Sequence, residues 1–424
     1  MDYDTIVIGG GASGIFAAIF ASEENKKVLL LEKNKTLGAK LKITGGGRCN
    51  ILNAELDKNI LLSNYKEASK YLHSPFSKFG VEETIKYFSS LGIDIKVEDR
   101  KRAFPKSEKA IDVFKSLEAQ LIKNKVEIKT NTAVEKIIIR NGEVKGVKLF
   151  DDTKIITADK YILSTGGYSH PETGSTGDGF NFLKEHKIKI DEATPSLVPI
   201  AVREDWVKNL SGKTIENLKI TFFVDEVKRK VLKTDIQNKN RILFTHFGLS
   251  GPTILNNSKY ISDFLHEGSV TISLDLFPDK NEKELDDFLL SVFDRNKNKI
   301  LKNILNEIYP GNVLEEIFSD QSSLLGKISI NREVNDIKKE ERKIMVKTLK
   351  NLIINVDSLM GFDKAIIADG GVDISEIDFE SMSLKKIKNL CVTGDMLNIS
   401  RPSGGYSLQI CWTTGYVAGK AKIV

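Results

Sequence analysis

Three glycines near the start of the chain have the spacing of a turn that binds a dinucleotide. Gly9, Gly11 and Gly14 follow the apolar residues 3–8, which predict a buried strand, and precede residues 15–22, which predict a helix. In such a turn the first glycine allows the tight bend, the second lets a pyrophosphate reach the backbone, and the third lets helix and strand pack closely. The phosphates then meet the free N–H groups at the helix N-terminus. By itself the turn is compatible with NAD, NADP or FAD.

An acidic residue follows at the distance that ribose recognition requires. Residues 27–31 predict a second buried strand, and Glu32 ends it, close to ~20 residues after the turn, where a carboxylate accepts from a ribose 2′-hydroxyl. A glycine-rich turn without a ligand is the alternative, and the strand, helix and acid together argue against it. The pattern predicts a ligand that contains adenosine diphosphate.

A second glycine-rich stretch, residues 45–47, runs directly into Arg48, Cys49 and Asn50. Its backbone can pass close to something flat or anionic, and a flexible linker would not need the two strong polar groups. Cys49 beside an arginine suggests a reactive thiol with a lowered pKa, with packing as an equal explanation. Arg48 and His246 are the candidate polarising or acid/base groups. For Arg48 the alternative is a contact with the flavin, and for His246 it is a structural role.

The C-terminal part of the chain supplies what the flavin end of an FAD site needs. Residues 390–395 predict a buried strand that ends in Gly394-Asp395, and a glycine turn precedes an apolar helix from Ser407 to about residue 421. The carboxylate of Asp395 can accept from ribityl hydroxyls. The helix N-terminus can stabilise negative charge on a reduced flavin. This narrows the ligand to FAD, held from both ends of the chain.

The elements between these motifs predict an α/β fold with a Rossmann-like FAD domain. Residues 159–163 form another predicted buried strand, before Thr165-Gly166-Gly167, and no second G-x-G-x-x-G follows. Asn141-Gly142 predicts a tight hairpin, residues 100–105 predict a basic turn, and Ser250 predicts a helix N-cap before Pro252. The predicted parts are an FAD domain from 1–191 and 361–424, a β-barrel-like insert at 192–278 with a returning strand at 350–360, and a helical subdomain at 279–349.

Composition places the chain among ordinary globular proteins. Of 424 residues, 41% are hydrophobic and 29% charged, and the net charge of +5 is spread along the chain. The three cysteines have no C-x-x-C spacing and the five histidines no metal-ligand spacing, so neither a disulfide framework nor a metal site is expected. Without a membrane-spanning run or a charged leader, we expect a cytoplasmic protein.

Taken together, these motifs resemble the BaiN/YhiN-like (aminoacetone oxidase-like) family of NAD(P)/FAD-dependent oxidoreductases, which has a glutathione-reductase-like FAD domain. The resemblance covers nearly the whole chain. It rests, in order, on Gly9-x-Gly11-x-x-Gly14, Thr44-Gly-Gly-Gly-Arg-Cys-Asn50, Arg102-x-Phe-Pro105, Gly174-Ser-Thr-Gly-Asp-Gly179, Phe244-Thr-His-Phe-Gly-Leu-Ser-Gly-Pro252, Gly370-Gly-Val372 and Gly404-Gly-Tyr406.

The resemblance implies the three-part architecture, a ribose contact at Glu32 and an adenine contact at Ala133-Val134. The chain departs from the family where Asp395 replaces a glutamate, Ser407 an asparagine, and Ser381-Met-Ser-Leu-Lys385 the usual Thr-Met-x-Ser-Lys. The cofactor-binding residues predicted in all are Gly9, Gly11, Ala12, Ser13, Gly14, Glu32, Lys33, Lys40, Gly46, Gly47, Arg48, Cys49, Asn50, Ala133, Val134, Thr165, Gly166, Gly167, Gly394, Asp395, Gly405, Tyr406 and Ser407.

The expected activity is hydride transfer between FAD and a small organic substrate, with NAD(P)H as a transient co-substrate. An oxidase that uses O₂ on an amine or alcohol is the first alternative. A flavin-dependent tRNA-modifying enzyme is the second, against which stand the modest charge and the lack of a basic stripe interleaved with aromatics. A non-catalytic flavin-binding protein would leave the loop at 45–50 unexplained. Neither a nucleic-acid partner nor a membrane is expected.

Overall fold

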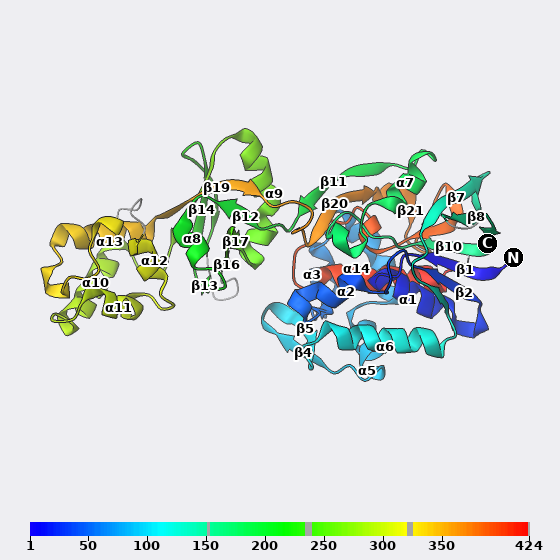
Figure 1. Ribbon diagram of the computed structural model, residues 1–424, viewed down its shortest axis with the longest axis horizontal. Helices are drawn as coiled ribbons and strands as arrows, with labels where there is room; N and C mark the ends of the chain where they lie inside the picture. The colour runs from blue at the N-terminus through cyan, green and yellow to red at the C-terminus, as the bar shows by residue number, and fades with distance from the viewer. Residues whose placement is uncertain (151–152, 234–239, 320–324, 423–424) are drawn as a thin grey trace. The chain divides into compact units, whose positions relative to one another are not determined.

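The computed structural model describes residues 1–150, 153–233, 240–319 and 325–422. Contacts divide the chain into two units. Unit 1 combines Met1–Ser196 with Phe362–Val424, and unit 2 is Leu197–Gly361. Each unit has its own hydrophobic core. The first and last parts of the chain therefore share one folded body, as the blue and red ribbons of unit 1 show (Figure 1).

The main sheet of unit 1 has a core of parallel strands, which confirms the predicted α/β fold. Its strands are buried apolar runs such as those of β1 and β2, as expected of a sheet covered on both faces. The strand order is β21 (Ile377–Asp378), β22 (Ser383–Leu384), β23 (Ile387–Val392), β10 (Ala158–Leu163), β1 (Tyr3–Ile8), β2 (Val28–Leu31) and β6 (Glu127–Lys129). The pairs from β23 to β6 are parallel, so their carboxyl ends lie at one edge of the sheet.

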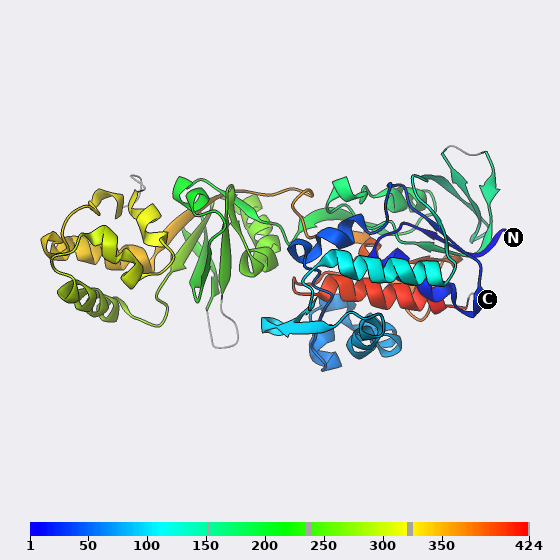
Figure 2. The ribbon, with the colours of Figure 1, turned by 60° about the horizontal axis from the view of Figure 1, so that its bottom comes forward.

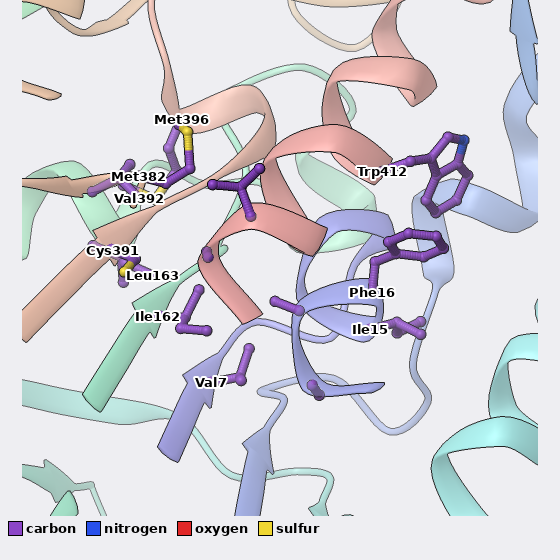
Figure 3. Packing of buried hydrophobic residues seen from close by; sticks show 14 of the residues in the cluster. Val7, Ile15, Phe16, Ile162, Leu163, Met382, Cys391, Val392, Met396 and Trp412 are labelled. Carbon is purple, nitrogen blue, oxygen red and sulfur yellow. The ribbon is translucent and has the colours of Figure 1, made fainter. Parts of the chain in front are cut away.

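Helix α1 (Ala12–Ala21) packs against both α14 (Tyr406–Lys420) and α6 (Ala110–Lys123). Figure 2 shows the cyan and red helices of this layer lengthwise. The contact between α1 and α14 combines aromatic rings with a close approach of the two backbones. Phe16 lies 5.0 Å from the Trp412 ring, centroid to centroid (Figure 3), and Trp412 lies 5.3 Å from Phe88 of α5. A Cβ at Gly415 would lie 2.6 Å from the Ser13 carbonyl oxygen. This packing brings the last helix of the chain against the first.

A buried lysine closes the other end of α14. Lys160 lies on β10, and its ammonium group donates to the carbonyl oxygens of Ala418, Gly419 and Ala421 at 3.0, 2.7 and 3.0 Å. These carbonyls have no partner within the helix, because a helix leaves its last C=O groups unpaired. Burial lowers the pKa of Lys160. The three charge-assisted bonds hold the C-terminus of α14 against the central strand.

Three smaller sheets, β3-β5-β4, β7-β8-β9 and β11-β20, and several helices complete the described part of unit 1. The hairpin predicted at Asn141-Gly142 is confirmed, since both residues have positive φ, 52° and 73°, between β7 and β8. The basic turn predicted at 100–105 is wrong in its second half, because Arg102–Pro105 pairs with two neighbouring segments as β5. The remaining elements are α2 (Ala39–Ile43), β3 (Leu52–Asn53), α3 (Lys58–Ser63), α4 (Ser69–Lys78), α5 (Val81–Ser90), β4 (Ile95–Glu98), β7 (Val134–Arg140), β8 (Glu143–Leu149), β9 (Ile155–Ile156), α7 (Asp178–Lys184), β11 (Ile190–Ser196) and β20 (Ile367–Val372).

Unit 2 begins with an antiparallel sheet. Its order is β13 (Thr214–Glu216), β16 (Arg241–Thr245), β17 (Gly248–Ser250), β12 (Ile200–Val202), β19 (Leu352–Leu359), β18 (Val270–Asp275), β14 (Lys219–Val224) and β15 (Val227–Leu232). Strand β19 returns to this sheet after the helices α10 (Glu282–Arg295), α11 (Leu301–Ile308), α12 (Val313–Ser319) and α13 (Lys339–Lys350). Residues 320–324 of the predicted helical subdomain lie outside the described ranges.

The predicted N-cap at Ser250 is wrong. Ser250 pairs with Leu243 as the last residue of β17, so Gly251 becomes the N-cap of α9 (Pro252–Glu267) and Pro252 its first residue. The strand that displaces the cap depends on hairpin pairing with β16, which local sequence does not reveal. A further short helix, α8 (Asp205–Asn209), packs against this hairpin. In the described ranges no helix is both long and apolar enough to cross a membrane.

Candidate cofactor-binding site

A cavity of about 420 Å³ opens at the carboxyl ends of β1 and β2. Its size is that of an ordinary small-ligand pocket. Six of the predicted cofactor-binding residues lie together in its wall: Gly9, Glu32, Lys33, Ala133, Val134 and Thr165. The structure therefore brings the turn, the acid and the expected adenine contact into one place, although they are far apart in sequence.

Glu32 is tied to the backbone through both carboxylate oxygens. Oε2 accepts from the Gly10 N–H at 2.8 Å, and Oε1 accepts from the Asn34 N–H at 2.8 Å. The side chain is buried at the cavity wall. Since each carboxylate oxygen has a second lone pair, Glu32 can order the glycine turn and still accept from a ligand hydroxyl.

Replacing Glu32 by glutamine should weaken FAD retention at least tenfold. The new NH₂ group would face the N–H of either Gly10 or Asn34, so one backbone donor loses its acceptor, at a cost of about 1–3 kcal/mol. Fluorescence titration of the apoprotein with FAD measures this. Glu135→Gln is the matched control, because Glu135 lines the same cavity and pairs with Lys148 near the surface. Equal affinities of the two variants would refute the role given to Glu32.

Lys33 forms one side of the cavity through its contacts with the Gly174–Gly179 motif. Its Nζ lies 2.6 Å from the carboxylate of Asp178, the first residue of α7, and 2.5 Å from the hydroxyl of Thr176. The pair joins the end of β2 to the start of α7. Lys33 therefore acts first as a structural link at the cavity rim.

The N-terminus of α1 fits a pyrophosphate. Gly11 is its N-cap and offers no side chain to cap the first-turn N–H groups. A Cβ added at Gly11 would meet no described atom within 4 Å, so the space before the helix is open. Free N–H groups, open space and the helix dipole are what an anion requires.

Beyond this turn, Thr165–Gly167 lies against the segment that follows β23. The Thr165 hydroxyl is 3.3 Å from the sulfur of Met396, and a Cβ at Gly167 would lie 3.1 Å from the Asp395 carbonyl oxygen. A Cβ at Gly394 would in turn lie 2.6 Å from the Ser13 hydroxyl. The loops after β10 and β23 and the start of α1 therefore meet at one edge of the sheet, where open α/β folds bind ligands.

Asp395 belongs to a buried ion-pair cluster that sequence reasoning only partly identified. Its carboxylate forms a salt bridge with Arg401, and its Oδ2 lies 3.7 Å from the Lys40 ammonium, which also donates to the Ser169 hydroxyl at 3.0 Å. Burial alone would raise the pKa of Asp395, but the charges of Arg401 and Lys40 lower it below its usual value. Lys40 was predicted, whereas Arg401 was not.

A histidine that sequence reasoning did not single out lies beside Ser169. The Nδ1 of His170 is 2.7 Å from the Glu172 carboxylate, and the residue has a left-handed φ of 54°. Glu172 is also within the field of Lys40. The contact between Lys40 and Ser169 is the signal that would have pointed to His170, and the sequence does not reveal that contact.

The loop at 45–50 divides into an open part and an anchored part. Gly46 and Gly47 are exposed, and a Cβ at either would meet no described atom within 4 Å. Arg48 instead pairs with Glu98 and Glu108 at 2.7 and 2.8 Å and stacks on Phe104. Its charge is thus already compensated within the protein.

Cys49 is not an activated thiol. It has no exposed surface, and burial raises its pKa to about 12, which contradicts the lowered pKa suggested by the neighbouring arginine. The guanidinium of Arg48 is directed to Glu98 and Glu108, so proximity in sequence did not place a cation near the sulfur. Cys49 packs in the core.

Asn50 and the turn before α14 hold each other in place. With its amide oriented to satisfy both ends, Asn50 accepts from the Gly405 N–H at 3.0 Å and donates to the Leu52 carbonyl at 3.1 Å. Gly405 has a φ of 100°, and a Cβ there would lie 2.2 Å from the Leu52 carbonyl carbon. The carbonyl of the following Tyr406 accepts from the buried Tyr65 hydroxyl at 3.1 Å. The start of α14 is fixed by these contacts.

His246 lies in unit 2, in the turn between β16 and β17. Its ring is exposed and lies 4.9 Å from that of Phe247. Its catalytic role remains a prediction. In the described residues no group of His, Cys, Asp and Glu is arranged to hold a metal ion.

The chain is similar over nearly its whole length to proteins of known name. The chain is 28% identical over 418 residues to 3-dehydro-bile acid delta(4,6)-reductase from Clostridium scindens, covering 98% of each chain. It is 24% identical over 421 residues to ribosomal RNA dihydrouridine synthase from Escherichia coli, covering 99% of this chain and 98% of that protein. The crystal structure of 3-ketosteroid delta1-dehydrogenase from Sterolibacterium denitrificans has the same fold, with a TM-score of 0.53, 14% identity and 98% of each chain covered.

The model of the HI0933-like protein Rossmann domain matches residues 3–421, nearly the whole chain. This agrees with the BaiN/YhiN-like resemblance carried by the seven motifs. The chain therefore belongs to the HI0933-like family and is an FAD-dependent oxidoreductase.

Proposed function

We propose that the protein is an NAD(P)H-dependent reductase of a carbon–carbon double bond conjugated to a carbonyl group in a small molecule. The observation that carries the proposal is the full-length similarity to a delta(4,6)-reductase and to a dihydrouridine synthase, two names that both describe the saturation of a carbon–carbon double bond. A delta(4,6) 3-oxo steroid has its double bonds conjugated to the 3-oxo group, and dihydrouridine arises when the uridine double bond next to a carbonyl is reduced. The carbonyl is what makes such a bond a hydride acceptor.

The residues of unit 1 can hold FAD along the carboxyl edge of the sheet. Glu32, with Ala133 and Val134, would take the adenosine, and the α1 N-terminus the pyrophosphate. Asp395 would accept from the ribityl chain, and the N-terminus of α14 would face the flavin ring, as the positions of the two loops support. Bound FAD would supply hydride transfer, and the protein supplies orientation and electrostatics.

The electron donor would bind transiently. The sequence has one G-x-G-x-x-G, which the FAD site uses, so a second dinucleotide has no dedicated turn of this kind. Either NADH or NADPH would then reduce the flavin and leave before the acceptor binds. The competing proposal is an oxidase, in which an amine or alcohol reduces the flavin and O₂ accepts the electrons.

A uridine of ribosomal RNA is the second candidate substrate. Two relatives carry the dihydrouridine synthase name, at 24% and 25% identity and over 98% and 96% of their own lengths. Against it stands the near balance of 63 basic and 58 acidic residues, which gives little general attraction to phosphate backbones. The small-molecule reading is therefore preferred.

Anaerobic mixing of the FAD-loaded protein with NADH or NADPH tests the proposal. One of them should bleach the flavin absorbance, and a 3-oxo-4,6-diene steroid should restore it at least tenfold faster than the saturated 3-oxo steroid. Restoration by ribosomal RNA alone would favour the second candidate, and fast restoration by air after reduction by an amine or alcohol would favour the oxidase. Flavin that neither nicotinamide bleaches would refute the reductase.

A further inference from the structure

Arg401 is among the most deeply buried charged side chains described, with 1% of its side-chain surface exposed. It lies between Asp395 and the start of α14. Its Nη1 donates to the Ile399 carbonyl at 2.6 Å, its Nε to the Ser407 hydroxyl at 3.0 Å, and its Nη2 to the Asp395 carboxylate. All three guanidinium nitrogens are therefore directed at fixed partners.

These contacts join the two structures that would face the flavin. Asp395 directly follows Gly394 in the loop after β23, and Ser407 is in the first turn of α14. The link is independent of Lys40, which approaches the other carboxylate oxygen at 3.7 Å. The Asp395 oxygens retain lone pairs that are free to accept from a ligand, since a carboxylate has about four such sites.

The charge of this cluster matters because its side chains are largely buried, Arg401 most of all. Coulomb interactions are several times stronger in a protein interior than in bulk solvent. Reduction adds negative charge to a flavin, and an uncompensated carboxylate nearby would oppose it. An arginine is the side chain suited to cancel that carboxylate, because it stays protonated and is a planar, rigid donor.

We propose that Arg401 is a positioning residue that fixes Asp395 for the ribityl chain and cancels its charge, so that reduction of the bound flavin is not opposed. The inference rests on the proposed placement of FAD in unit 1. It assigns to Arg401 a role in the reduction potential as well as in cofactor retention, which a purely structural anchor of α14 would not have.

The test compares Arg401→Gln, Asp395→Asn and the double variant. For each, the dissociation constants of oxidised and reduced FAD and the midpoint potential are measured with the full chain. Arg401→Gln should weaken reduced FAD about tenfold more than oxidised FAD, which is a fall of about 30 mV for a two-electron couple. Asp395→Asn should shift the potential in the opposite direction, and the double variant should return to within threefold of the wild-type ratio.

Two further variants separate charge from packing. Arg401→Lys keeps the charge but cannot reach three partners, so it should weaken both redox states equally and leave the potential unchanged. Lys33→Gln removes a cation from the cavity proposed for the adenosine, so it should change the affinity for both redox states equally and leave the potential unchanged. If Arg401→Gln does not fold, Asp395→Asn still decides, because its potential should rise while that of Arg401→Lys should stay at the wild-type value.

Shifts of the same sign for Arg401→Gln and Asp395→Asn would overturn the inference. So would an unchanged potential in every variant that binds FAD. A wild-type protein that takes up no FAD would refute the proposed function and this inference with it, whereas wild-type uptake with unchanged variant potentials refutes the inference alone.

Discussion

Replacing Gly14 by alanine is expected to lower the free energy of unfolding by about 3 kcal/mol, through overpacking at a site that cannot expand. A Cβ at this position would lie 1.9 Å from the Gly9 carbonyl oxygen and 3.1 Å from the Ser164 Cβ. Both obstacles directly follow central strands, Gly9 after β1 and Ser164 after β10, so α1 must move away from the sheet. Urea unfolding measures the loss, and the flavin content of the purified protein should fall with it.

Gly11→Ala is the matched control, since it adds the same methyl group three residues earlier. No described atom lies within 4 Å of the new Cβ, so stability should change by less than about 1 kcal/mol. The methyl group would instead occupy the space proposed for the pyrophosphate and reduce FAD affinity at least tenfold. A stable Gly14→Ala protein would contradict the tight packing of α1 on the sheet, and a Gly11→Ala protein with wild-type FAD affinity would contradict the placement of the cofactor.

Trp412→Ala should cost about 3–5 kcal/mol, the range for loss of a large buried aromatic side chain. Trp412 has no exposed surface and packs between Phe16 and Phe88. Its Nε1 also donates to the Ile51 carbonyl at 2.9 Å, which fixes the loop before β3. The loss would loosen α14 from α1, so thermal or urea unfolding and FAD retention should both report it.

Trp412→Phe separates the two contributions. The smaller ring keeps most of the packing but leaves the Ile51 carbonyl without its donor, so a loss of about 1–3 kcal/mol is expected. Equal losses for Trp412→Phe and Trp412→Ala would show that the hydrogen bond, and not the aromatic packing, holds the helix.

The parts of the fold predicted best are those whose signals are local. The turn from Gly9 to Gly14, the acid at Glu32 and the hairpin at Asn141-Gly142 each combine a backbone requirement with neighbouring residues, and the structure has all three elements. Ser250 failed because pairing with Leu243 draws it into a strand. Such pairing is decided by the whole sheet, which residue preferences do not encode.

The candidate site was predictable in its glycines and less so in its charges. Arg401 lies six residues from Asp395 in sequence, yet nothing in the local pattern says that its side chain turns inward. Lys160 caps carbonyls 258 residues and more away, which only the folded chain reveals. Cys49 shows the same limit, since burial outweighs the neighbouring arginine in setting its pKa. Charged groups acquire their roles from tertiary partners.

The division of unit 1 between two distant segments sets the order in which the protein can be completed during synthesis. Strands β1, β2 and β10 emerge from the ribosome early, but β23 and α14 follow only after all of unit 2 has been made. Unit 2 has a core of its own and can fold in the interval, because domains generally fold as units. Asp395, Arg401 and α14 are made only after unit 2, so with the proposed placement of FAD the cofactor would be taken up only by a chain translated through α14.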